Sequence, residues 1–176
     1  MELRLLRESD DRAAFSSGDE DLDRFFHRYA GQNQFRHHLG ATWVAVAAGR
    51  IVGFVTLAPG QLDTDELQAT LERRLPGYPL PLLRLARLAV SASDRGHGIG
   101  TALVRKACLL ALEMAERFGC LGIVVDAKPD AIGFYGDLGF FPLEVTAGTL
   151  DTRPRPTAMF LPLALVERAR AGGPTS

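Results

Sequence analysis

The stretch Ser93-Asp94-Arg95-Gly96-His97-Gly98-Ile99-Gly100-Thr101-Ala102 joins an apolar, strand-like run to a long amphipathic helical pattern. Three glycines at alternate positions leave backbone N–H groups uncovered by side chains. Because a helix is expected to begin near Ile99, these donors lie at its positive dipole end. The stretch therefore predicts a cradle for a phosphate group.

This loop differs from two common nucleotide-binding motifs. No Gly-Lys-Ser/Thr follows it, so it is not a P-loop. Its glycines lack the G-x-G-x-x-G spacing of a Rossmann fingerprint. Taken alone, the loop is also compatible with a glycine-rich turn that binds nothing.

The elements on either side of the loop predict a parallel crossover. Apolar residues recur with a helical period from Ile99 to Phe118, and Gly119 is the stop signal. The run 82–90 before the helix and the run 121–127 after it are predicted strands. A strand, a helix and a second strand in this order form a right-handed βαβ unit with parallel strands.

The rest of the chain predicts further strands and short helices. A capping box from Ser17 to Glu20 is expected to open a helix with an apolar face. Adjacent histidines follow it at 37 and 38 and are expected to be surface residues rather than metal ligands. The remaining expected elements are strands at 2–7, 42–47, 51–57, 139–142 and 157–163, helices at 65–75 and 130–138, a stiff connector at 76–81, a turn-rich segment at 146–156 and a last helix ending at Arg170.

Composition is typical of one globular domain. The chain has 176 residues, 47% of them hydrophobic, and a net charge of −1, so no global basic field indicates nucleic acid. Cys108 and Cys120 have no metal-binding or disulfide pattern, and metal is expected to be absent. With a charged N-terminus and no run near ~18 apolar residues, a cytoplasmic protein without a membrane span is expected. We predict a single domain over 1–170 and a disordered tail at 171–176.

A composite motif resembles a known superfamily. The motif R-x-x-G-x-G at 95–100, between strand and helix, is followed by A-x-x-F-Y-x-x-x-G-F at 131–140. This combination and the order of the elements resemble the GNAT superfamily of N-acetyltransferases over nearly the whole chain. The resemblance implies an α/β (α+β) fold, with a mixed, mostly antiparallel sheet of six or seven strands. It also implies a parallel βαβ crossover and helices on both faces.

The resemblance also implies an enzyme that uses acetyl-CoA. Tyr135 would be the general acid for the leaving CoA thiolate, although a core aromatic residue is the alternative. Lys128 stands where many members carry Asn, which puts any contact of that Asn in doubt. The implied cofactor-binding residues are Leu88, Ala89, Val90, Arg95, Gly96, His97, Gly98, Ile99, Gly100, Thr101 and Phe134.

The acceptor amine is indicated by an absence and by a narrower resemblance. Strand 82–90 lacks the Glu or Asp that many members place there as a general base. An α-amino group, with a pKa near ~7.7–8.0, needs less help than a lysine at ~10.4. Segments at 15–26, 28–34, 53–60 and 85–90 resemble the toxin branch of the superfamily, which acetylates the α-amino group of aminoacyl-tRNA and so stops translation.

The toxin branch implies a basic tRNA surface, a small antitoxin partner and a homodimer. Arg84 and Arg87 interrupt an apolar strand, so they either face the open side of the sheet or reach a ligand. An acetyltransferase of a small amine or a protein N-terminus, and a non-catalytic acyl-CoA-binding module, are the alternative functions. The candidate substrate-binding arginines are Arg24, Arg28, Arg36, Arg73, Arg74, Arg84 and Arg87.

Overall fold

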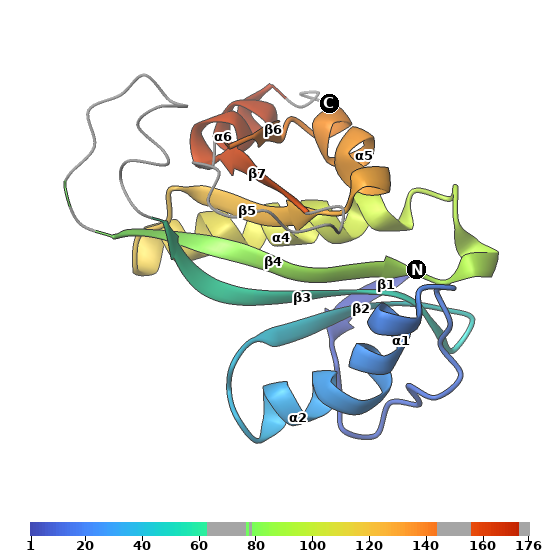
Figure 1. Cartoon of the computed structure of the whole chain (residues 1–176). Helices are drawn as coiled ribbons and strands as arrows, with labels where there is room; N and C mark the ends of the chain where they lie inside the picture. Colours follow the sequence, from blue (N-terminus) through green and yellow to red (C-terminus); the bar gives the residue numbers. More distant parts are fainter. Residues whose placement is uncertain (63–76, 78, 144–155, 173–176) are drawn as a thin grey trace, which may run out of the picture. The chain divides into compact units, whose positions relative to one another are not determined.

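The computed structural model describes residues 1–62, 77, 79–143 and 156–172, which contain seven strands of one sheet in the order β1-β2-β3-β4-β5-β7-β6 (Figure 1). The strands are β1 (Glu2–Leu5), β2 (Ala41–Ala47), β3 (Arg50–Leu62), β4 (Leu80–Val90), β5 (Gly122–Ala127), β6 (Phe141–Pro142) and β7 (Thr157–Pro162). The helices are α1 (Glu20–Arg24), α2 (Ala30–Phe35), α4 (Ile99–Arg117), α5 (Ile132–Asp137) and α6 (Leu163–Ala171).

The sheet is mixed and mostly antiparallel. β1 with β2, β2 with β3, β5 with β7 and β6 with β7 all pair in antiparallel fashion. β4 and β5 are neighbours and begin at the same edge, where Leu121 N–H donates to Pro81 O at 2.9 Å. These two strands therefore run parallel, with α4 between them in sequence. The predicted fold class, including this crossover, is confirmed.

The chain divides into two compact units, and β3, β4 and α4 each contribute residues to both. The first unit contains residues 1–58 and 85–107, and the second contains residues 59–84 and 108–176. The single domain expected over 1–170 stays a prediction.

In the first unit, helices cover both faces of the sheet. Side chains alternate along β3, so that Phe54 and Gly53 face opposite sides. Phe54 stacks on Phe26 from the helical segment after α1, with ring centroids 4.3 Å apart. On the other face, Gly53 lies against α4, and Lys106 of α4 sits 4.0 Å from the ring centroid of Trp43. The first turn of α4 is thereby held on β3.

The second unit has a separate apolar core between its strands and loops. Its buried residues are Leu80, Leu82, Val124, Leu143 and Phe160. β7 pairs with β5 along its whole length, and α6 begins directly after it. Leu163 N–H donates to Leu121 O at 2.9 Å, which fixes the start of α6.

The N-terminal elements differ from expectation at two ends. β1 stops at Leu5 rather than residue 7, because the Asp10 carboxylate accepts from Arg7 N–H and from the Arg4 guanidinium and turns the chain. The capping-box prediction was wrong. Asp19 caps α1 by accepting from two backbone N–H groups, and α1 begins at Glu20.

Other predicted boundaries also moved. A π-helical turn, Phe25–Tyr29, separates α1 from α2. β3 continues through Gly60, where a Cβ would lie only 3.2 Å from a Leu82 methyl group. α6 extends to Ala171, one residue into the predicted tail. The expected helix at 65–75 and most of the turn-rich segment at 146–156 lie outside the described residues.

Adding a methyl group at Gly53 should destabilise the protein. A Cβ there would lie 2.9 Å from Ile99 Cγ2 and 3.1 Å from the Ala89 carbonyl oxygen, so α4 or β4 must shift. We expect Gly53→Ala to lower the free energy of unfolding by about 1–3 kcal/mol. Denaturant titration measures it.

Gly133→Ala is the matched control, because a Cβ at this helical position meets open space. It should leave the free energy of unfolding unchanged or raise it by about 0.5–1 kcal/mol. Equal losses in the two variants would contradict the close packing of α4 on β3.

Candidate functional site

The loop between β4 and α4 has the geometry of an open backbone cradle. After β4 ends, Ser91 N–H donates to Val52 O at 2.9 Å, and a 3₁₀ turn, Ala92–Asp94, follows. Gly96 and Gly98 have φ of +79° and +74°, and a Cβ added at either would meet nothing within 4 Å. Both glycines are exposed. The space beside this backbone can therefore accept a ligand group.

The first turn of α4 supplies hydrogen-bond donors to this space. The first helical bond runs from Ala102 N–H to Gly98 O at 3.0 Å. The N–H groups of Ile99, Gly100 and Thr101 therefore precede the helical ladder. Ile99 is buried against Gly53, which fixes the position of the turn. Three donors at the positive end of a 19-residue helix suit a phosphate group.

Asp94, at the start of the loop, is held by a forked ion pair. Arg50 Nη1 and Nη2 donate to its two carboxylate oxygens at 2.8 and 2.7 Å. The Ser93 hydroxyl donates to the same carboxylate at 2.8 Å. These bonds hold the pKa of Asp94 far below its ordinary range, with the Arg50 contact the largest cause. Asp94 therefore stays ionised beside the loop.

A second set of contacts ties the loop to the segment before α1. Ala92 N–H donates to Ser16 O at 3.0 Å, and the Arg95 guanidinium donates to Ser17 O. The Asp23 carboxylate accepts from the Ser17 hydroxyl at 2.6 Å and from Ser17 N–H at 2.8 Å. Burial acts to raise the pKa of Asp23, but these hydrogen bonds outweigh it and the pKa is lowered.

Arg95, which was predicted to bind acetyl-CoA, contacts the segment before α1. At least one guanidinium N–H is engaged by Ser17 O, while the residue as a whole is exposed. Because a guanidinium carries five donors, the contact with Ser17 leaves others. Its role toward phosphate stays a prediction.

The last residues of β4 lead directly into the loop. Ala89 is buried, while Leu88 and Val90 are half-buried. Arg87 is exposed, donates to Ala86 O at 2.7 Å and lies over the Phe25 ring at 5.2 Å. Of the two alternatives for the strand arginines, Arg87 thus lies on an open surface. The cofactor-binding role of residues 88–90 stays a prediction.

Tyr135 lies in α5, in the second unit, and is 5% exposed. Its ring packs edge-on against Phe134 and Phe140, with centroids 5.1 and 5.3 Å away. Burial raises the pKa of Tyr135 to about 12, so its phenol keeps its proton at neutral pH. A protonated phenol can donate to an anion, as the predicted general acid must. Lys128 precedes this segment, and its carbonyl accepts from Ala131 N–H at 2.9 Å.

Apart from Arg87, the candidate substrate arginines fall into three groups. Arg28 and Arg36 are exposed on the helical segment of the first unit. Arg24 pairs with Asp21, and Arg84 pairs with Asp126 at 2.8 Å, so their charges are partly neutralised. Arg73 and Arg74 lie outside the described residues. No Asp or Glu occurs between residues 24 and 62, so the only charged side chains of this stretch are basic.

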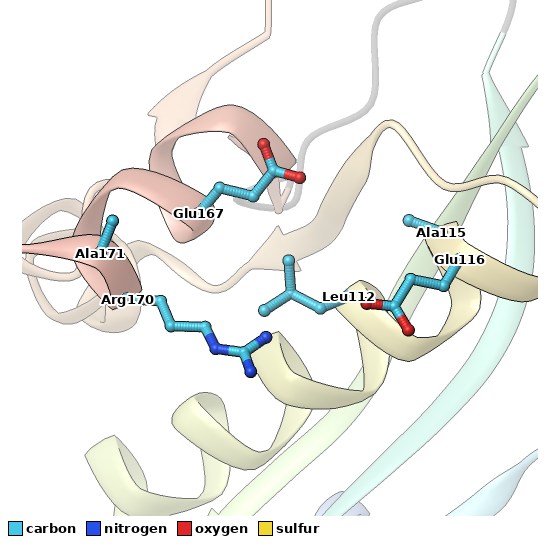
Figure 2. A pocket seen from close by; sticks show the side chains of 6 residues that line it. All are labelled: Leu112, Ala115, Glu116, Glu167, Arg170 and Ala171. Atoms are coloured by element: carbon cyan, nitrogen blue, oxygen red, sulfur yellow. The ribbon is translucent and has the colours of Figure 1, made fainter.

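A groove of about 510 Å³ lies in the second unit and contains none of the predicted site residues (Figure 2). Leu112, Ala115 and Glu116 of α4 line it, together with Glu167, Arg170 and Ala171 of α6. Its two carboxylates make it a poor site for an anion. Within the described residues, no cluster of His, Cys, Asp and Glu could hold a metal ion. None of the described helices has the length and apolar character of a membrane span.

Residues 38–142 match the family model of the acetyltransferase (GNAT) domain, which covers more than half of the chain. The chain is a GNAT acetyltransferase. A relative from Mycobacterium tuberculosis (strain ATCC 25618 / H37Rv), named tRNA-acetylating toxin, is 34% identical over 140 residues, 78% of this chain and 82% of the relative.

Solved structures similar to this acetyltransferase include two of the toxin AtaT. One is AtaT complexed with acetyl-methionyl-tRNAfMet, at a TM-score of 0.79 and 22% identity over 96% of this chain and 98% of that one. The other is a mutant AtaT bound to the C-terminus of the antitoxin AtaR and acetyl-CoA, at 0.73 and 21% over 96% and 97%. At these identities they show the shared fold.

Sequence reasoning missed the residues that hold the loop of this acetyltransferase. Arg50 is the first residue of β3, directly after the β2–β3 turn and 44 residues before its partner Asp94. Asp23 was given no role of its own, although it binds the segment next to the loop. One available signal was the residue type of Asp23, since Asp side chains often accept hydrogen bonds from nearby backbone N–H groups.

The ionisation of Tyr135 is testable. A phenol ordinarily has a pKa near ~10, whereas burial raises the pKa of Tyr135 to about 12. The wild type and Tyr135→Phe should therefore show the same rise in phenolate absorbance up to about pH 11. Circular dichroism confirms that the protein remains folded. One additional phenolate in the wild type near pH 10 would contradict the burial of this hydroxyl.

Proposed function

We propose that this acetyltransferase moves the acetyl group of acetyl-CoA to the α-amino group of aminoacyl-tRNA and thereby blocks translation as a toxin. The relative named tRNA-acetylating toxin carries this proposal, because its 34% identity spans most of both chains. The open backbone cradle and the buried, protonated Tyr135 supply the chemistry that such a reaction needs.

In this proposal, the loop binds the pyrophosphate of acetyl-CoA. The N–H groups of Ile99, Gly100 and Thr101 donate to phosphate oxygens, and Gly96 and Gly98 leave the backbone accessible. A side chain at either position would occupy the open space beside this backbone and would strain a backbone with positive φ. Arg95 and His97 flank the phosphates, and backbone N–H groups at 88–90 bind the acyl arm and the thioester carbonyl.

The amine attacks the thioester carbonyl carbon, a C–N bond forms and the C–S bond breaks. The sulfur leaves with the electron pair of that bond and takes the phenolic proton of Tyr135. The amine loses one proton to water, and the phenol regains one from solvent. Tyr135 carries its phenolic proton at neutral pH, so this proton is present when the thiolate forms.

The charge of the first unit supports aminoacyl-tRNA as the acceptor. Arg28 and Arg36 are exposed, and the stretch 24–62 contains no acidic residue, so tRNA phosphates meet little repulsion there. β4 has no Glu or Asp to deprotonate an amine. An α-amino group is already largely neutral near pH 8, which suits this lack.

We also propose that an antitoxin protein neutralises the enzyme, as the structure of AtaT with AtaR suggests for a protein of the same fold. The homodimer expected from the resemblance stays a prediction.

Replacement of the Tyr135 hydroxyl should remove most of the activity. With labelled acetyl-CoA and charged tRNA, we expect Tyr135→Phe to reduce kcat by about 10²- to 10⁴-fold while the KM for acetyl-CoA changes little. Induced wild-type protein should arrest growth, and the variant should not. The measurements are acetyl-aminoacyl-tRNA yield and growth after induction.

Tyr29→Phe is the matched control, since it removes a phenolic hydroxyl from a side chain that is 46% exposed. Its kcat should equal that of the wild type. The enzyme could instead acetylate a small amine or a peptide N-terminus, with no turnover of charged tRNA and no growth arrest. This result would contradict tRNA as the acceptor but not the acetyltransferase activity. An active Tyr135→Phe enzyme would contradict the general acid.

A further inference from the structure

Arg50, the first residue of β3, reaches the glycine loop from the end of the β2–β3 hairpin. It lies in the first unit, as does the loop. Its guanidinium makes two parallel hydrogen bonds to Asp94, at 2.8 and 2.7 Å. This forked geometry is stronger and more directional than a single-contact ion pair. The turn of a hairpin is thus fastened to the first residues of the loop.

Asp94 passes this restraint on to the loop backbone. Its carboxylate accepts from the Ser93 hydroxyl, and its carbonyl oxygen lies 3.1 Å from Nδ1 of His97. Asp94 N–H in turn donates to Ser91 O at 2.9 Å. Asp94 therefore contacts residues on both sides of Arg95, and its position sets that of the backbone leading to Gly96 and Gly98.

The negative charge of Asp94 would disfavour phosphate binding if Arg50 did not neutralise it. Asp94 stands two residues before Gly96, and its carboxylate is only 18% exposed. An unpaired carboxylate here would repel a pyrophosphate bound to the adjacent donors. Arg50 cancels this charge, and its own side chain is 54% exposed, so the pair contributes little to overall stability.

We propose that Arg50 is a positioning residue for the acetyl-CoA phosphates, acting through its forked ion pair with Asp94. This inference rests on the proposed binding of those phosphates by residues 95–101. In this proposal Arg50 does not contact acetyl-CoA. It restrains Asp94 at the start of the loop and neutralises the charge of its carboxylate.

Calorimetric titration with CoA tests this role on the whole protein. Arg50→Ala should weaken CoA binding by about 3- to 10-fold and raise the KM for acetyl-CoA to the same extent. Its kcat and its KM for charged tRNA should match the wild type, a split that general destabilisation would not produce. Arg50→Lys, which keeps the charge without the fork, should fall between the two.

A double-mutant cycle with Asp94→Asn tests whether Arg50 acts through Asp94. In the Asp94→Asn background, Arg50→Ala should change CoA affinity by less than about 2-fold, because the shared contact is already lost. An unchanged effect of Arg50→Ala in both backgrounds would overturn the inference. Arg7→Ala, which removes another exposed arginine of this unit, should leave CoA affinity unchanged.

Gly98→Val separates this inference from the proposed phosphate site. If the site is right, this variant should weaken CoA binding, because its side chain would fill the open space beside the loop and strain a backbone with positive φ. If Gly98→Val weakens binding and Arg50→Ala does not, the positioning role alone is wrong. If neither variant weakens binding, the phosphate site itself is wrong.

Discussion

The proposed phosphate site depends on the N–H groups of Ile99, Gly100 and Thr101. The hydrogen bonds of α4 begin only at Ala102, so these three groups must find partners outside the helix. In an exposed loop without side chains at Gly96 and Gly98, water or an anion can reach them. The dipole of a 19-residue helix favours the anion. In the proposed site of this acetyltransferase, backbone N–H groups are therefore the main hydrogen-bond donors to phosphate.

Such a surface works only if its backbone is held still. Because Gly53 has no side chain, Ile99 and Leu103 can approach β3 closely, and the first turns of α4 pack against this strand. Arg50 holds Asp94 from the hairpin turn, and Ser16 and Ser17 hold Ala92 and Arg95 from the N-terminal segment. These contacts come from parts of the chain that are far apart in sequence. Donors that are already ordered lose less entropy when a ligand binds.

The parts of the fold that repeat a local pattern could be predicted from the sequence. The period of α4, the strands on either side of it and the glycine loop are local signals, and all three are confirmed. The cap of α1 was not predictable with certainty, because Ser17 and Asp19 are both good N-cap residues two positions apart. Ser17 instead bonds Asp23, a choice that depends on the folded chain.

The long-range pairs of the site could not be predicted for a different reason. Arg50–Asp94 and Arg84–Asp126 join residues that are 44 and 42 positions apart, and nothing in the sequence near an exposed arginine identifies its partner. Sequence reasoning therefore named Arg84 as a candidate for substrate binding without naming a partner, whereas the fold pairs it with Asp126. It named Arg95 for its motif and missed its contact with Ser17.

Titration of the isotope-labelled protein with CoA, followed by amide NMR, tests the phosphate-binding role of the loop most directly. Direct donation of N–H groups to phosphate should give the largest shifts at Gly98, Ile99, Gly100 and Thr101. The groove residues Glu116 and Glu167 should show almost none. Large shifts elsewhere, with unchanged signals from these four residues, would contradict the assignment of the loop.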